Sequence, residues 1–108
     1  MSMSITVSND VAQHLNSLAI GEMTDVNDKL RSLLEAEYRR QLTRYSLTDR
    51  QLTQKYHTDF ETFERQQLTK QHGYSWDVES DAIAWEQAVD GIRTMQRKLA
   101  EVLQKGRS

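Results

Sequence analysis

The chain of 108 residues contains no proline and only four glycines. These two residues are the ones that most often interrupt regular secondary structure. Because they are so scarce, the sequence predicts a chain that is helical over most of its length and broken at few points. The predicted fold class is mainly α.

One segment departs from the helical pattern. Apolar and hydroxyl side chains alternate in it, in the order Met3, Ser4, Ile5, Thr6, Val7 and Ser8. A period of two is expected of a half-buried β-strand, and no second strand-like run follows. A lone strand leaves its backbone N–H and C=O groups unpaired, so we expect it to pair with the same strand of a second copy. The sequence therefore predicts an intertwined homodimer.

Two amphipathic helices are predicted after this strand, with a turn at Gly21 between them. The first is capped within residues 8–10 and runs to about residue 19. The second is capped by Thr24 or Asp25 and runs to about residue 45, with Arg39, Arg40 and Arg44 near its end. Its apolar side chains recur every three or four residues: Val26, Leu30, Leu33, Leu34, Tyr38, Leu42 and Tyr45.

Further helices are predicted from residue 46 onward. A short one runs to about residue 56, and a capping box at residues 58–61 opens another that ends near Gly73. The last helix spans about 25 residues and carries a heptad-like apolar stripe. The stripe consists of Val78, Ala82, Trp85, Val89, Ile92, Met95, Leu99 and Val102. In total, we expect one short strand followed by four or five helices.

The composition describes a surface-rich chain with little apolar material for a core. The net charge is −2, charged residues make up 28% and hydrophobic residues 37% of the chain, and the mean hydropathy is −0.76. Small chains of this kind are rarely stable alone, which favours oligomerisation or a partner. No apolar run has the roughly 20 residues that a membrane span needs. We expect a cytoplasmic protein that does not enter a membrane.

A set of spaced apolar and turn residues runs through the first half: Ile5-x-Val7, Leu15-x-x-Leu18-Ala19, Gly21, Asp25 and Leu30-x-x-Leu33-Leu34. The order of strand, helix, glycine turn and capped helix over residues 3–42 resembles the ribbon–helix–helix fold of small bacterial DNA-binding proteins. The resemblance implies a homodimer. The residues expected at its interface are Ile5, Val7, Leu30 and Leu34.

The same resemblance implies contacts to operator DNA. Side chains on the outward face of the ribbon would touch base edges, and the start of the second helix would hold a phosphate. The residues expected in these roles are Ser4, Thr6, Ser8, Thr24, Asp25 and Val26. The ribbon's polar face carries no basic or amide side chain, so the counterion-release contribution to DNA affinity is expected to be small.

The second half contains motifs rich in aromatic and acidic residues: Tyr56-His57-Thr58-Asp59-Phe60-Glu61-x-Phe63-Glu64, Trp76-Asp77-Val78-Glu79-x-Asp81 and Ala84-Trp85-Glu86. Residues 50–103 are similar to the C-terminal arms of small antitoxins of type II toxin–antitoxin systems. The similarity implies that residues 1–45 dimerise and that a helical arm, residues 46–108, binds a cognate toxin protein. Its expected anchors are Tyr56, Phe60, Phe63, Trp76, Trp85, Val89 and Ile92, since large aromatic side chains dominate interface energetics.

Several interpretations stay open. The preferred one is an antitoxin that neutralises a protein toxin and can repress its own operon. The alternatives are a dimeric helical adaptor that binds no DNA and pairs through its last helix, and a stand-alone ribbon–helix–helix repressor. The aromatic side chains could equally form the core of a helical hairpin in which the Phe60/Phe63 helix folds back on Trp85.

No catalytic site, metal, cofactor or small-molecule substrate is expected. Cysteine is absent, and the three histidines, at positions 14, 57 and 72, are scattered without the spacing of metal ligands. There is no glycine-rich phosphate loop. The carboxylates of the last helix crowd its first turn, where the helix dipole stabilises them.

Overall fold

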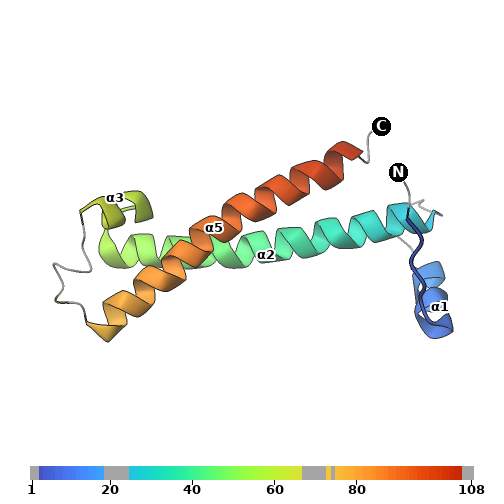
Figure 1. Ribbon diagram of the computed structural model, residues 1–108, viewed down its shortest axis with the longest axis horizontal. Coiled ribbons are helices and arrows are strands. Elements are labelled where there is room, and N and C mark those ends of the chain that lie inside the picture. The colour runs from blue at the N-terminus through green and yellow to red at the C-terminus, as the bar shows by residue number, and fades with distance from the viewer. Residues whose placement is uncertain (1–2, 19–24, 67–72, 74, 106–108) are drawn as a thin grey trace.

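A computed structural model describes residues 3–18, 25–66, 73 and 75–105. This part of the chain forms four helices: α1 Asn9–Ser17, α2 Val26–Tyr56, α3 Phe60–Arg65 and α5 Trp76–Lys105. Figure 1 shows α2 and α5 as a long antiparallel hairpin whose helices cross near the middle. α3 lies beside the end of α2, and α1 lies at the opposite end (Figure 1). The molecule is elongated, with extents of 56 × 30 × 25 Å.

The prediction of a mainly helical chain is confirmed, but the predicted β-strand and ribbon–helix–helix fold are wrong. Residues 3–8 have no regular secondary structure, and the described residues contain no strand. Alternation gives the segment an apolar face, yet a strand exists only where another strand pairs with its backbone. In the structure the apolar side chains of Ile5 and Val7 instead line a pocket with Leu15 and Val26.

Helix α2 is longer than predicted and runs without a break from Val26 to Tyr56. The helix start expected at residue 46 is absent, and the hydroxyl of Thr48 bonds within the helix instead of capping a new one. Thr48 donates to the carbonyl of Arg44, four residues earlier, at 3.4 Å. The helix therefore crosses the boundary between residues 1–45 and 46–108, and that division into two parts stays a prediction.

Capping residues mark the points at which the helices begin and end. Asp59 caps α3 by accepting a hydrogen bond from the Thr62 N–H at 2.7 Å, and Ser75 Oγ accepts from the Val78 N–H at 3.3 Å at the start of α5. α2 ends at Tyr56, and the following residue, His57, has the left-handed conformation, with φ 56°. α3 ends at Arg65, earlier than predicted, and residues 67–72 lie outside the described residues.

An aromatic cluster joins α2, α3 and α5 at one end of the hairpin. It consists of Tyr56, Phe60, Phe63 and Trp85. Trp85 is fully buried, and the ring centroids of Tyr56, Phe60 and Phe63 lie 5.9, 5.6 and 5.1 Å from that of Trp85. These separations are the ones at which aromatic pairs attract beyond simple burial. We call this end of the hairpin the closed end.

The apolar stripe predicted on the last helix is confirmed as the inner face of α5. Val78, Trp85, Met95 and Leu99 are buried along it. Most contacts between elements are made between α2 and α5. The partner of the stripe is thus α2 of the same chain, which leaves little of the stripe for a coiled coil between two copies.

The two long helices approach very closely at Gly91 of α5. A Cβ atom added to Gly91 would lie 2.6 Å from two ring carbons of Tyr45 on α2, a separation that real Cβ atoms essentially never show. Glycine at this position therefore sets the distance at which the helices cross. A lone glycine inside a helical pattern indicates such an approach, although it does not name the partner.

Gly91→Ala is expected to destabilise the fold by about 1–2 kcal/mol, because overpacking outweighs the gain in helix propensity of about 1 kcal/mol. Urea denaturation monitored by circular dichroism measures the change. In a Tyr45→Ala background the same substitution should become stabilising, since the ring is gone. A gain in stability from Gly91→Ala alone would contradict the close approach.

Candidate interaction surface

The end of the hairpin opposite the aromatic cluster carries most of the exposed apolar side chains. Among the described residues, ten large apolar side chains are exposed, and seven of them belong to residues 3–34: Met3, Ile5, Val7, Val11, Val26, Leu33 and Leu34. Exposed apolar patches mark interaction sites more often than ordinary surface does. We call the surface formed by Met3, Ile5, Val7, Val26, Leu30 and Leu34 the open-end surface.

Two neighbouring pockets are hollowed into the open-end surface. One, of about 250 Å³, is lined by Met3, Ile5, Val7, Leu15, Val26, Asn27 and Leu30. The other, of about 340 Å³, is lined by Asn27, Leu30, Arg31, Leu34 and Val102. Leu30 borders both pockets. The structure therefore brings together all four residues predicted to form a dimer interface, although without the strand that suggested two of them.

A buried lysine holds α1 against this end of the hairpin. Lys29 is only 5% exposed, and its Nζ donates hydrogen bonds to the carbonyls of Leu15 and Asn16 at 3.3 and 3.2 Å. The carbonyls in the last turn of a helix attract a cation, both as acceptors and through the helix dipole. α1 buries no side chain completely, so this contact is a main link between α1 and α2. Nothing in the sequence pattern distinguished Lys29 from the exposed lysines.

Lys29→Met keeps the length of the side chain and removes its charge. We expect amide hydrogen exchange in α1 to rise about tenfold, equivalent to about 1.4 kcal/mol, because the link to Leu15 and Asn16 is lost. Hydrogen–deuterium exchange measured by mass spectrometry follows α1 and α5 separately. Lys98→Met, a matched change on α5, should leave α1 unaffected, and equal exchange in both variants would contradict the role of Lys29.

The residues expected to touch DNA bases do not form a ribbon. Ser4 and Thr6 are exposed in the irregular segment. Ser8 is the residue before α1, and its hydroxyl donates to the carboxylate of Asp10 at 2.5 Å. This hydrogen bond, followed by one from the Val11 N–H, lowers the pKa of Asp10. The surface around Ser8 is therefore negative, which opposes DNA phosphates.

The start of α2, expected to bind a phosphate, is occupied by its own capping residue. The carboxylate of Asp25 accepts a hydrogen bond from the Asn27 N–H at 2.7 Å. A carboxylate in this position satisfies the helix N-terminus and repels a second anion. Val26 opens the helix at 39% exposure, and Thr24 lies outside the described residues.

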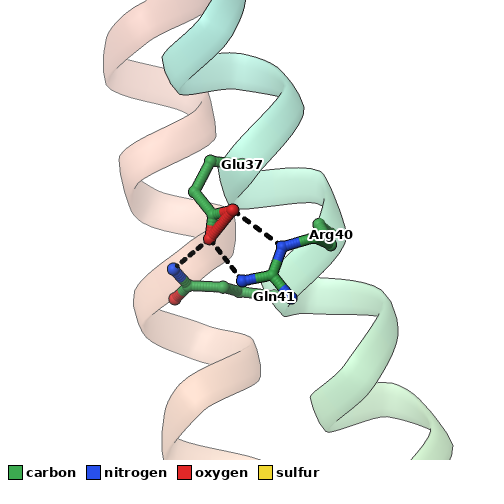
Figure 2. Close-up of polar contacts among 3 residues, drawn as sticks. All are labelled: Glu37, Arg40 and Gln41. Carbon is green, nitrogen blue, oxygen red and sulfur yellow. Dashed lines mark hydrogen bonds and ion pairs between the residues drawn. The ribbon is translucent and has the colours of Figure 1, made fainter.

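Arg39 and Arg40, in the middle of α2, pair with acidic side chains of the same helix. Figure 2 shows the Glu37 carboxylate reached from two sides, by Arg40 and by Gln41. Arg40 Nε and Nη2 donate to it at 2.7 Å each, and Gln41 Nε2 donates at 2.8 Å. Arg39 forms a similar pair with Glu35 at 3.0 Å. These pairs support the long helix and offset the charge of two of its arginines, whereas the Arg44 guanidinium lies over the Tyr45 ring, 5.4 Å from its centroid.

The Glu37 carboxyl is expected to stay ionised in strong acid. Hydrogen bonds from Arg40 and then from Gln41 lower its pKa to about 2. This pKa is below the ordinary value of 4.5, so the ionised carboxylate stabilises the fold fully above pH 4.5. The stabilisation is lost as the pH falls through about 2. NMR titration of the glutamate carboxyl carbons measures it. Arg40→Gln should move the pKa back towards 4.5, and an ordinary value in the unchanged chain would contradict the arrangement.

The structure divides the residues predicted to anchor a partner. Four of them, Tyr56, Phe60, Phe63 and Trp85, form the aromatic cluster, so the alternative of a helical-hairpin core is the arrangement that the chain has. Two more, Val89 and Ile92, are half-buried on α5. Trp76 is the remaining one and is 78% exposed. Phe63 and Trp85 are buried in the free chain and are therefore not available as anchors, whereas Tyr56 and Phe60 are partly buried.

Hydrogen bonds fix the orientation of the rings in the aromatic cluster. Trp85 Nε1 donates to Asp49 at 2.8 Å, and the Tyr56 hydroxyl and Lys55 Nζ each donate to Asp81 at 2.6 Å. Burial and then the hydrogen bond to Asp81 raise the pKa of Tyr56 to about 12. Although burial opposes ionisation of Asp81, the hydrogen bonds that it receives lower its pKa. The sequence pattern did not reveal these contacts, because they join α2 and α5 across many residues.

The described residues contain neither a metal site nor a membrane-spanning helix. Among the described residues, no group of three or more histidine, aspartate or glutamate side chains could hold a metal ion. None of the described helices combines the length and the apolar character needed to cross a lipid bilayer. Comparison of the chain with known protein families, curated proteins and solved structures finds no match.

Proposed function

We propose that the chain is a homodimeric antitoxin that neutralises a cognate protein toxin by binding it. The observation that carries this proposal is the apolar surface that the single chain leaves exposed. Among the described residues, ten large apolar side chains are exposed, and seven of them lie within residues 3–34. Exposed apolar patches of this kind mark interaction sites.

The hairpin architecture explains this exposure. Two crossing helices cover each other along one face only, and α3 and α1 cover no more than the two ends. Each long helix therefore keeps a wide exposed face. A small chain of this shape has a modest core and gains stability when a partner covers more of its apolar surface.

The open-end surface is the part proposed to bind a second copy. Its apolar side chains come from residues 3–7 and from α2, and they surround two pockets that share Leu30. Polar groups there are few, since the recess is bordered mainly by aliphatic side chains with Asn27 and Arg31 at its edge. Apolar surface of this kind is typical of the centre of homodimer interfaces.

The toxin as second partner is supported by the similarity of residues 50–103 to antitoxin arms. The aromatic and acidic motifs of that similarity lie on α3 and on the first half of α5, at the closed end. A dimer formed at the open end leaves these elements uncovered. One molecule can therefore bind a second copy and a toxin at the same time.

The dimer is tested by Leu34→Asp, with Leu47→Asp as the matched control. The two leucines lie on the same helix and are 48% and 51% exposed, but only Leu34 belongs to the open-end surface. A carboxylate buried in the interface is expected to cost several kcal/mol and to raise the dimer dissociation constant at least about 100-fold. Analytical ultracentrifugation measures it, and a monomeric parent chain would overturn the dimer.

Neutralisation is tested in cells. The open reading frame beside the gene is expressed alone and together with the chain, and growth is measured. We expect the neighbouring product to arrest growth alone and the chain to restore it through a complex that co-purifies. Absence of both rescue and complex would overturn the antitoxin proposal.

A further inference from the structure

The outer face of the first half of α5 carries two large exposed apolar side chains. Trp76 is 78% and Ile83 is 57% exposed. Residues seven apart on a helix lie on the same face, here about 10 Å apart along the axis. The buried Val78 and Trp85 belong to the inner stripe, so Trp76 and Ile83 lie on the side of α5 that faces away from α2.

Acidic side chains border these two residues. Residues 76–92 contain five acidic side chains and no basic one. Asp81 is used within the hairpin, where it pairs with Lys55 at 2.6 Å. Glu86 and Asp90 are exposed, and neither forms an ion pair with a cation of the described residues. The face is therefore apolar at its centre with uncompensated negative charge around it.

We propose that this α5 outer face, formed by Trp76, Ile83, Glu86 and Asp90, is the surface that binds the toxin. The inference rests on the proposed function and adds the chemistry of the partner. The toxin presents an apolar recess that receives Trp76 and is bordered by lysine or arginine side chains. Opposite charges across such a contact speed association and exclude wrong partners.

The charge of the α5 outer face favours a basic toxin over a second copy of the chain as its partner. In a twofold-symmetric contact the same patch meets itself, so the acidic stretch of one copy would lie against that of the other. The two stretches of residues 76–92, each with five acidic side chains and no basic one, would repel each other. A basic partner meets no such repulsion, and the second copy binds the open-end surface, which lies at the other end of the hairpin (Figure 1).

The aromatic cluster prepares this face for binding. Trp85, between Ile83 and Glu86 in the chain, is fully buried on the inner side and held by its hydrogen bond to Asp49 at 2.8 Å. The helix that carries Trp76 is thus ordered before a partner arrives. Ordered anchors lose little conformational entropy on binding, so more of their burial contributes to affinity.

The apolar part is tested with the full chain and the purified product of the neighbouring reading frame. Trp76→Ala should weaken the complex about 30-fold and Ile83→Ala about tenfold, as measured by titration calorimetry. Leu47→Ala is the matched control, since Leu47 is 51% exposed on α2, and it should leave the affinity unchanged. The melting temperature and the dimer should be unaffected in all three variants.

The acidic part is tested by reversing charge. The double variant Glu86→Lys, Asp90→Lys should slow association about tenfold at low ionic strength, and the effect should fade as salt is added. Glu101→Lys alters an exposed carboxylate of α5 outside this stretch and should change the rate little. Stopped-flow measurement of tryptophan fluorescence follows the reaction, and the signal from Trp76 should be absent in Trp76→Phe.

The outcomes separate the two proposals. If the parent chain binds and neutralises the toxin but Trp76→Ala and the charge reversal do so equally well, the α5 outer face is overturned and the antitoxin proposal stands. If the parent chain neither binds nor neutralises the neighbouring product, both are overturned. Loss of affinity in the α5 variants with unchanged stability supports both.

Discussion

Trp85 is fully buried and joins three helices of the chain. Its indole is the point at which three helices meet, with Tyr56 from α2 and Phe60 and Phe63 from α3 around it. Its ring nitrogen would be unsatisfied in that core, and Asp49 accepts its hydrogen bond. Aromatic side chains bury the largest apolar areas of any residues, so much of the stabilisation of this small fold comes from this one cluster.

Away from the aromatic cluster, the two long helices bury less of their apolar surface. Beyond the crossing at Gly91 the helices are held by a narrow seam that includes Met95 and Leu99, and the apolar side chains near the start of α2 stay exposed. The closed end is therefore compact, whereas the open end leaves apolar side chains uncovered. This asymmetry places a surface suited to a second copy at one end and leaves the outer face of α5 uncovered at the other.

Several charged side chains are also neutralised by groups close to them in the structure. Arg39 and Arg40 of α2 are paired with glutamates one turn away, and Lys29 is buried against the end of α1. In the acidic stretch of α5, by contrast, only Asp81 has a cationic partner among the described residues. Charge that is compensated within the chain contributes to its fold, whereas uncompensated charge remains available for recognition.

Local patterns in the sequence predict a mainly helical chain and the inner face of α5. The absence of proline, the capping box at residues 58–61 and the apolar stripe of the last helix depend on neighbouring residues, so the sequence reveals them without a structure. It could not decide whether residues 3–8 pair as a strand, since that depends on a partner for their backbone. Nor could it decide which aromatics are core. Only the tertiary structure buried Trp85 and left Trp76 exposed, because that choice depends on which face of α5 meets α2.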